Sequence, residues 1–429
     1  MQPTYIDTYY SRTAATSETY PRAAGRIQAD VCIVGGGLAG LTAALKLARS
    51  GRKVVLLEAQ RVAWGASGRN GGFVSAGYAT GLAAIERRAG PDQARELFRL
   101  SMEGVEIVRS NIDELGIQNA HRVPGIAKAL RYNSRGALQA ASERQRSEFG
   151  LQLRYVPRDE VRELFISPKY HEAVLDEGAF HFHPLNYGRA LAREAARLGA
   201  SIHEHSSVTA ADLDSARKVL RAGDAEISTE HVVFATGGYT GAVLPALKRA
   251  FLPIATYVLL SEQAPELVQG AIRTQAAILD DRRAGDYYRL VDGGNRILWG
   301  GRITTRTTDP HDIAALLRRE MVTTYPQLAD VKVEIAWSGL MSYARHLMPQ
   351  IGRLQPGVWY CTAFGGHGMN TTAIGGKVVA EAIAGDSDRY RLFEPFGLAW
   401  NGGPFGRAAA QLTYWTYQAM DAWRERKAA

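Results

Sequence analysis

Three glycines at fixed spacing, Gly35, Gly37 and Gly40, form the pattern in this chain that is best suited to hold a ligand. They follow an apolar run at residues 31–34 and precede an alanine- and leucine-rich stretch at 41–50, which predicts strand, turn and helix. Gly35 permits the tight turn, Gly37 lets the backbone approach a pyrophosphate, and Gly40 lets the helix pack against the strand. Because the N–H groups and the dipole at a helix start favour phosphate, the segment predicts a dinucleotide site.

An acidic residue, Glu58, follows a second apolar run at residues 54–57, at the interval of roughly 20 residues typical of such sites. Its carboxylate would accept hydrogen bonds from ribose hydroxyls and disfavour a 2′-phosphate, so FAD or NAD is expected rather than NADP. The alternative is a glycine-rich turn in another kind of α/β protein. The strand, the helix, the second strand and the acid at this interval favour the dinucleotide site.

A second glycine-rich segment, Gly-Ala-Ser-Gly-Arg-Asn-Gly-Gly at residues 65–72, comes soon after Glu58. Its four glycines predict close backbone approach to another part of the same ligand. Arg69 is expected to neutralise the pyrophosphate. A flexible turn is the alternative, and the three polar side chains Ser67, Arg69 and Asn70 make it less favoured.

Two later strands also run into glycine. Residues 230–234 lead into Ala235, Thr236 and Gly237, an exit expected to pass near the cofactor. Residues 358–363 lead into Gly-Gly-His-Gly at 365–368, and a helix is predicted to begin near Thr371 or Thr372.

The start of that helix, with its hydroxyl caps, would stabilise negative charge, such as the charge that a reduced flavin develops on its pyrimidine ring. His367 lies just before it and is a candidate catalytic residue, because an imidazole can both donate and accept a proton. A structural histidine with satisfied hydrogen bonds is an equally weighted alternative.

The remaining pattern predicts the elements that must position these segments. Residues 251–305 are rich in apolar β-type runs, and Asp292-Gly293-Gly294-Asn295 is a hairpin signal, so a separate antiparallel sheet is expected as a platform for substrate. Helices are predicted at 91–116, 134–149, 158–165, 184–198 and 309–325, strands at 173–182, 201–205 and 332–337, and a β-meander at 208–230.

Length and composition agree with a globular protein. The 429 residues are 46% hydrophobic and 22% charged, which predicts two or three domains. The net charge is +8, but lysine and arginine are scattered, so no nucleic-acid partner is expected. No secretory pattern, no membrane span and no metal site is expected either. Cys32 and Cys361 lie in apolar runs and are predicted to be buried reduced thiols of a cytoplasmic protein.

Together, the first glycine pattern with Glu58, the 65–72 loop, the exit at 235–238 and Gly-Gly-His-Gly-Met-Asn-Thr-Thr at 365–372 resemble the D-amino-acid-oxidase-like FAD-dependent oxidoreductases. Within them the chain is most similar to the gamma-glutamylputrescine oxidoreductase branch, through motifs at 183–186, 287–289 and 299–302. The resemblance covers nearly the whole chain.

The resemblance implies an α/β fold in which a Rossmann-like FAD-binding domain of the glutathione-reductase type carries an inserted antiparallel β-sheet substrate domain. Residues 1–85, 173–245 and 335–429 would form the FAD-binding domain, and 86–172 and 246–334 the substrate domain. The implied reaction is oxidation of an amine C–N bond, with a hydride passing to flavin N5 and the imine hydrolysed to aldehyde plus amine. A D-amino-acid or sarcosine-like oxidase or dehydrogenase is the alternative. Oxygen or another acceptor would reoxidise the flavin.

Two departures from relatives bear on the cofactor. Some relatives link FAD to a cysteine in the strand where this chain has Met341, so non-covalent FAD is predicted. They also carry an oxygen-activating lysine in the strand equivalent to 296–300, where this chain has Leu298. Fast oxidase activity is therefore in doubt, and a quinone or electron carrier stays open.

The expected catalytic residues are His367, Arg289, Tyr287 and Trp337. Tyr287 and Arg289 share one face of their strand, from which Arg289 would hold a substrate carboxylate. A surface arginine and a core tryptophan are the alternatives. The expected cofactor contacts are Gly35, Gly37, Leu38, Ala39, Gly40, Glu58, Ala59, Gln60, Gly65, Ala66, Ser67, Arg69, Asn70, Gly71, Gly72, Val208, Ala235, Thr236, Gly237, Gly366, His367, Gly368, Met369, Asn370, Thr371 and Thr372.

Two other classes of protein remain as alternatives. One is a non-catalytic flavin- or nucleotide-binding module that would bind RNA through the +8 charge. An NAD dehydrogenase is disfavoured, because NAD does not require the loop after Glu58 or the glycines around His367. The oligomeric state is open.

Overall fold

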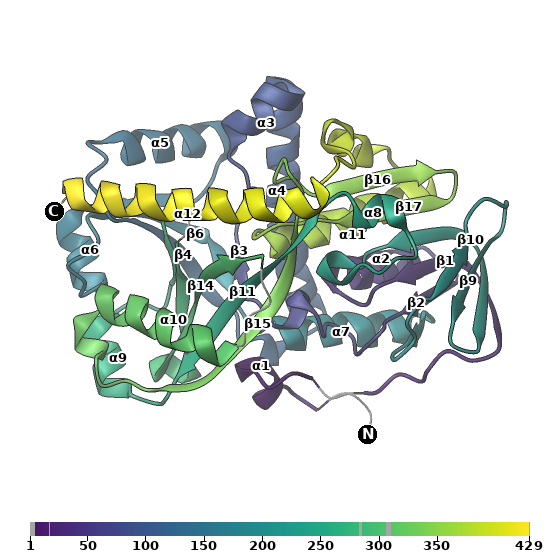
Figure 1. Cartoon of the computed structure of the whole chain (residues 1–429), viewed down its shortest axis with the longest axis horizontal. Helices are drawn as coiled ribbons and strands as arrows, with labels where there is room; N and C mark the ends of the chain where they lie inside the picture. Colours follow the sequence, from purple (N-terminus) through teal and green to yellow (C-terminus); the bar gives the residue numbers. More distant parts are fainter. Residues whose placement is uncertain (1–4, 17, 283–284, 306–309, 429) are drawn as a thin grey trace.

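The computed structural model describes residues 5–16, 18–282, 285–305 and 310–428, and is built on two β-sheets that lie side by side (Figure 1). In the first sheet the strand order is β16-β17-β10-β1-β2-β7, and β17, β10, β1, β2 and β7 run parallel. Their bounds are β1 Arg26–Val34, β2 Val54–Leu57, β7 Ser201–His203, β10 Ala225–Phe234, β16 Gln350–Gln355 and β17 Val358–Thr362, with β8 Ala210–Asp212 and β9 Lys218–Ala222 added antiparallel beside β10.

Helices cover one face of this parallel sheet, and the other face packs against β9 and residues 244–251, so its strands are buried on both faces. Val54 to Leu57 in β2 are fully buried, as are Val31 to Val34 at the end of β1. The covering helices are α2 Leu38–Arg49, α4 Pro91–Glu114, α7 Pro184–Arg197 and α11 Gly368–Ala384, and smaller helices are α1 Tyr9–Arg12, α3 Leu82–Ala89 and α8 Pro245–Lys248.

Glycines let α11 approach its neighbours closely. A Cβ at Gly376 of α11 would lie 2.5 Å from the carbonyl oxygen of Ala39 in α2. A Cβ at Gly104 of α4 would lie 2.5 Å from the carbonyl oxygen of Asn370 in α11. Both distances are too short for any larger residue, so backbone contact fixes how α2 and α4 sit against α11.

The second sheet has the order β15-β11-β14-β13-β12-β4-β6-β3, with β5 beside β6. The pairs are antiparallel except β12 with β4, so the sheet is mixed rather than purely antiparallel as expected. The bounds are β3 Phe73–Val74, β4 Val123–Leu130, β5 Leu153–Val156, β6 Glu172–His181, β11 Leu252–Ser261, β12 Ala277–Asp280, β13 Tyr287–Val291, β14 Arg296–Thr304 and β15 Val333–Tyr343.

The two faces of this sheet have different neighbours. One face carries Tyr288 and Trp299, whose rings stack at 4.0 Å, and forms a core with Leu317 and Met321 of α10. The opposite face carries Trp337, Leu298 and the partly buried Tyr287, and packs on α1. The flanking helices are α5 Ala137–Phe149, α6 Arg158–Leu164, α9 Pro265–Ala271, α10 Pro310–Thr324 and α12 Gly403–Ala428.

Sheet pairing cuts across the predicted domain boundaries. β6 and most of β15 were expected in the FAD-binding part, yet both pair within the second sheet. α4 was expected in the substrate part, yet it packs against α11. These pairings depend on distant partners that no local pattern reveals, and the division into two functional domains stays a prediction.

Several predicted boundaries shift for physical reasons. α2 begins at Leu38 and α11 at Gly368, three residues earlier than the sequence suggested, because glycines start both helices. β10 is one strand, whereas the sequence suggested a meander followed by a separate strand. α9 was not predicted, and Asp309 of the predicted 309–325 helix lies outside the described residues.

The substitution Gly104→Ala tests the contact between α4 and α11. Alanine ordinarily stabilises a helix interior by up to about 1 kcal/mol relative to glycine, but here its Cβ meets backbone that cannot move without shifting α11. We expect a net loss of about 1–3 kcal/mol, seen as a lower thermal unfolding midpoint. The matched control is Gly270→Ala in α9, where nothing lies within 4 Å of the new Cβ. A midpoint for Gly104→Ala as high as that of the control would contradict the contact.

Candidate functional site

The glycine turn after β1 is held by backbone contacts. Gly35 adopts a φ of +110°, and a Cβ there would lie 2.5 Å from the carbonyl oxygen of Ala235. A Cβ at Gly40 would overlap the carbonyl oxygen of Gly35. Gly35 therefore permits the tight turn and Gly40 the close helix–strand packing predicted for them. Ala235, which follows β10, lies directly beside the turn.

The two helices that follow glycine-rich segments receive no hydrogen bond from the side chain of their own N-cap residue, although Leu38 N of α2 donates to Ser67 Oγ. Gly37 is the N-cap of α2 and His367 the N-cap of α11, and neither makes a side-chain capping hydrogen bond. By contrast, the side chains of Thr8 and His183 cap α1 and α7. An uncapped helix start leaves N–H donors that an anionic group can satisfy. This arrangement fits a ligand with negative groups at two separate points.

Glu58 ties the end of β2 to the glycine turn. Its Oε2 accepts a hydrogen bond from Gly36 N at 2.7 Å, and its Oε1 accepts one from Gln60 N at 2.8 Å. Burial raises the pKa of this carboxyl above its usual range. Each oxygen keeps a free lone pair, so the carboxylate can still accept hydrogen bonds from ribose hydroxyls.

The 65–72 loop folds on itself and against α2. Ser67 Oγ accepts a hydrogen bond from Leu38 N at 3.0 Å, which places Ser67 at the start of the helix. Asn70 Nδ2 donates to the carbonyl oxygens of Ala66 and Ser67 at 2.9 and 3.0 Å, and its Oδ1 accepts from Gly72 N at 2.7 Å. Asn70 thus holds the shape of the loop, and the flexible-turn alternative does not fit.

Arg69 has protein partners that the sequence did not suggest. Its guanidinium donates to the carbonyl oxygens of Gly65 at 3.3 Å and Ser338 at 3.0 Å, and to the Tyr239 hydroxyl. It also stacks over the Trp64 ring at 4.6 Å. The expected contact with pyrophosphate stays a prediction.

His367 joins α11 to the loop after β3. Its Nε2 lies 3.0 Å from the carbonyl oxygen of Ser75, and burial lowers the pKa of the imidazole, which keeps it neutral. These contacts are those of the structural alternative, and the catalytic role stays a prediction. Asn370 Nδ2 donates to Gly77 O at 3.1 Å and Ser101 O at 3.2 Å in the same region.

Thr371 and Thr372 are not helix caps, so that expectation is wrong. Because α11 begins at Gly368, both threonines lie inside its first turns. Thr371 Oγ1 donates back to His367 O at 2.5 Å, and Thr372 Oγ1 to Met369 O at 3.2 Å.

Tyr287 and Tyr343 border the glycines of two loops. A Cβ at Gly71 would lie 2.9 Å from the Tyr287 ring, and a Cβ at Gly366 would lie 2.6 Å from the Tyr343 hydroxyl. Both residues are half-buried, and the burial of their phenol groups raises the pKa of each phenol and keeps it protonated. The strand alternation predicted for Tyr287 holds, since its neighbour Tyr288 lies in the core on the opposite face.

Arg289 is buried with neutral partners. Its Nη1 lies 3.1 Å from His181 Nδ1, and its Nη2 donates to Tyr10 OH and Phe182 O, each at 3.1 Å. The surface-arginine alternative is therefore wrong. Among the described residues its Nε has no hydrogen-bond partner, and no carboxylate pairs with it within 4 Å. Burying a cation without a paired anion costs free energy, so an anionic group bound beside Arg289 would be stabilised.

Trp337 of β15 is buried in the core that the second sheet forms with α1. Its side chain is 1% exposed, its indole Nε1 donates to Arg69 O at 2.9 Å, and its ring meets the Tyr10 ring edge-on at 6.1 Å. These contacts are those of the core alternative. A direct contact with substrate stays a prediction.

The other predicted cofactor residues fall into three places. Leu38 and Ala39 form the first turn of α2, and Gly237 begins a short turn beside β15, where a Cβ at the next glycine would meet Leu340 O. Ala59 is exposed and Val208 half-buried, beyond the ends of β2 and β7. The remaining positions, Gly65, Thr236, Gly368 and Met369, lie within the loops and helix start already described.

A cavity of about 340 Å³, which no sequence pattern predicted, lies between α4 and the strands β4 and β6. Its wall includes Ala76, next to the residue that binds His367. Its polar lining includes both signs of charge, and burial raises the pKa of Asp176 above its usual value. The charged residues are Glu106, Arg109, Arg122, Asp176 and Glu177.

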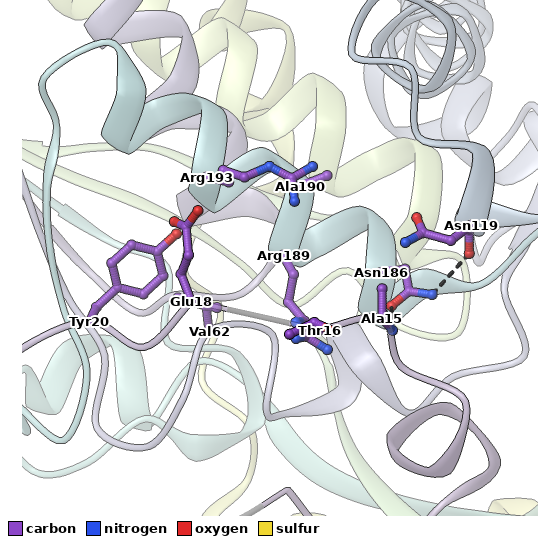
Figure 2. A pocket seen from close by; sticks show the side chains of 10 residues that line it. All are labelled: Ala15, Thr16, Glu18, Tyr20, Val62, Asn119, Asn186, Arg189, Ala190 and Arg193. Atoms are coloured by element: carbon purple, nitrogen blue, oxygen red, sulfur yellow. Dashed lines mark hydrogen bonds between the residues drawn. The ribbon is translucent and has the colours of Figure 1, made fainter.

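A smaller cavity, of about 60 Å³, lies between the N-terminal segment and α7 (Figure 2). Arg189 and Arg193 line it from α7, and Asn186 Nδ2 donates to Asn119 O at 2.9 Å at one end. None of its lining residues belongs to the glycine-rich segments.

Within the described ranges, no group of three acidic, cysteine or histidine side chains is placed to hold a metal, and no helix is long and apolar enough to cross a membrane.

Comparison with known proteins gives the setting for this site. Residues 30–382 match the family model of the FAD dependent oxidoreductases, DAO. The chain is 33% identical over 392 residues to gamma-glutamylputrescine oxidoreductase of Escherichia coli, covering 91% of each chain. It is 29% identical over 429 residues to the probable oxidoreductase OrdL of Haemophilus influenzae, covering 98% of each.

Solved structures share the fold. Glycine oxidase from Geobacillus kaustophilus superposes with a TM-score of 0.72 at 21% identity, over 87% of this chain and 99% of that one. L-amino acid deaminase from Proteus myxofaciens gives a TM-score of 0.72 at 20% identity, over 90% and 96%.

The histidines around Arg289 predict a stability that falls in acid. Burial, with the nearby Arg289 charge, lowers the pKa of His181 to about 3 and of His183 to about 3. The unfolded chain therefore binds more protons between pH 6.5 and 3, so stability is complete above pH 6.5 and is lost as pH falls. At pH 5 we expect a loss of up to about 2 kcal/mol for each histidine.

The substitution His181→Gln isolates one of these contributions. Glutamine can donate to Gln275 O and accept from Arg289 as the imidazole does. We expect the fall in unfolding midpoint between pH 7 and pH 5 to shrink in this variant. His121→Gln, at an exposed position, is the control. An unchanged pH dependence in His181→Gln would refute the assignment.

Proposed function

This chain belongs to the DAO family of FAD-dependent oxidoreductases, and we propose that its substrate is an amine extended by an acidic, gamma-glutamyl-like group. The protein is an FAD-dependent oxidoreductase that acts on C–N bonds of amines or amino acids. The observation that carries the choice of substrate is the match to gamma-glutamylputrescine oxidoreductase over 91% of both chains. Glycine oxidases match at 22–23% identity, so an amino-acid substrate is the second candidate.

We propose that the N-terminal turns of α2 and α11 hold the two charged regions of FAD, with Ser67 and Glu58 beside the first. When bound, the flavin accepts a hydride from the carbon next to the amine nitrogen. The N-terminus of α11 would stabilise negative charge near that ring. Neutral His367 would hold the loop at Ser75 in place, and the buried phenols of Tyr287 and Tyr343 would exclude water from the ring's edge.

We propose that FAD is bound without a covalent link. Met341 in β15 replaces the cysteine that links FAD in some relatives. The chain's two cysteines, Cys32 and Cys361, lie in β1 and β17 of the parallel sheet, and burial raises the pKa of each thiol. A protonated, inaccessible thiol is a poor partner for a covalent bond to the cofactor.

The charged cavity supports a substrate with a zwitterionic end. A gamma-glutamyl group carries one carboxylate and one ammonium, and the cavity wall carries arginines with carboxylates beside them. Arg109 donates to Gly178 O at 2.5 Å and pairs with Glu106, so its guanidinium is fixed in the wall. A plain diamine could pair with the carboxylates of this wall but would leave its arginines without a partner.

The reductive half-reaction tests the proposal. Purified holoprotein is mixed under nitrogen with gamma-glutamylputrescine, putrescine, glycine, sarcosine or a D-amino acid, and bleaching of the flavin absorbance is followed. We expect the glutamylated amine to reduce the flavin fastest. Faster reduction by an amino acid would favour the second candidate, and no reduction by any amine would refute amine oxidation. Readmission of air then shows whether oxygen reoxidises a protein that has Leu298 in place of a lysine.

The substitution Arg109→Gln tests recognition of the acidic group. Loss of a charged hydrogen bond typically costs about 1.5–3 kcal/mol, so we expect KM for the glutamylated amine to rise about tenfold to a hundredfold. The kcat/KM for putrescine should change little. The control is Arg99→Gln, an exposed arginine on the same helix. Equal losses of kcat/KM for the glutamylated amine and for putrescine would mean that Arg109 acts only in folding.

A further inference from the structure

The C-terminal helix α12 turns its polar side, rather than its apolar side, toward the protein. A helix on a globular protein normally faces its core with apolar residues. The inward contacts of α12 are polar instead: the Tyr414 hydroxyl accepts from Ile303 N at 3.1 Å, and Gln411 Oε1 accepts from Thr305 N at 3.4 Å. Glu425 lies 3.3 Å from Arg131 and 3.5 Å from Lys169.

The outward side of α12 carries the large apolar residues. Phe405 is 83% exposed, Leu412 59% and Trp423 58%, and these three lie close to one line along the helix. Trp415, at 53%, and Met420 flank that line, and Trp400 just before the helix is 65% exposed. Three of the chain's seven tryptophans are therefore exposed on this one surface. We call it the α12 face, defined as Trp400, Phe405, Leu412, Trp415, Met420 and Trp423.

The charges of α12 are sorted in the same way. Its exposed charged residues are all basic: Arg407, Arg424, Arg426 and Lys427. Its acidic residues are turned inward, Asp421 being buried and Glu425 paired with cations. The Lys427 ammonium lies 4.0 Å from the centre of the Trp423 ring, so a cation and an indole share one end of the face. The surface that α12 presents is thus apolar and positive.

We propose that the α12 face docks this protein on an anionic lipid bilayer, with the helix lying in the plane of the surface. A helix of 26 residues is about 39 Å long and can lay its side chains into the headgroup region along its length. Tryptophan is favoured at that depth, and lysine and arginine attract anionic headgroups. A second copy of this chain is a poorer occupant, because every exposed charge on the two helices would be positive. In Figure 1, α12 runs across the front of the second sheet, and no other helix or strand of the described residues lies in front of it.

Vesicle flotation with the holoprotein tests the proposal. Phosphatidylcholine vesicles that contain about 30% phosphatidylserine are expected to carry the protein at near-physiological salt, and vesicles of phosphatidylcholine alone to carry much less. At about 1 M NaCl the electrostatic part is screened and binding to the anionic vesicles should fall. Quenching of tryptophan fluorescence by brominated lipid would show that the indoles enter the bilayer.

Two variants separate the two parts of the surface. Arg424→Gln with Arg426→Gln and Lys427→Gln removes three cations, each worth about a fivefold change in binding, so affinity should fall about a hundredfold. Trp415→Gln with Trp423→Gln should abolish the quenching and weaken binding at both salt concentrations. The matched control is Leu267→Gln with Leu354→Gln, which removes exposed leucines outside α12. Flavin absorbance and the unfolding midpoint should be unchanged in all three.

Three results would overturn the proposal. The first is equal binding of wild type to vesicles with and without phosphatidylserine. The second is wild-type binding by both α12 variants. The third is a dimer or larger assembly by light scattering without lipid that the tryptophan variant breaks, which would make the α12 face an interface between copies or with a protein partner.

Discussion

The structure depends on two helices, α2 and α11, whose N-cap residues supply no side-chain hydrogen bond to the first N–H groups. α2 begins at Leu38 and α11 at Gly368, and the backbone of α11 at Gly376 lies close to Ala39 in the first turn of α2. The N–H groups that stay free at each helix start can be satisfied by an anionic ligand, which would stabilise both helices. Glu58 and Ser67 then lie where one end of that ligand would be held. The 65–72 loop and the turn after β10 pack around the same point.

The second sheet is joined to this site by buried polar contacts. Trp337 in β15 donates to Arg69 O, and Arg69 donates to Ser338 O in return, so the strand and the loop fix each other. Arg289 in β13 reaches Tyr10 of α1 and His181 of β6. Burial, together with the Arg289 charge, lowers the pKa of His181 and keeps it neutral, which explains how a guanidinium and an imidazole can share one buried space. An anionic group bound nearby would relieve that charge.

The sequence predicted what local chemistry determines. The spacing of Gly35, Gly37 and Gly40 and the interval to Glu58 are enough to predict strand, turn and helix, because each residue acts on its neighbours. The partners Ser338 and Tyr239 of Arg69, and all the partners of Arg289, were not predictable, since they lie more than 100 positions away in the chain. The starts of α2 and α11 were missed because a glycine ordinarily argues against a helix, and here it begins one. Sheet membership of β6 and β15 likewise depends on pairing that no single segment encodes.

The orientation of α12 shows a different limit of sequence reasoning. A hydrophobic period of 3.6 residues marks an amphipathic helix, but it does not say which side faces the protein. Only the contacts of Gln411, Tyr414 and Glu425 show that the polar side is turned inward. The same contacts explain why the inversion is stable, because Glu425 balances Arg131 and Lys169 beneath the helix. The acidic residues of α12 are thereby buried or paired beneath the helix, and its outer surface keeps its tryptophans together with an excess of positive charge.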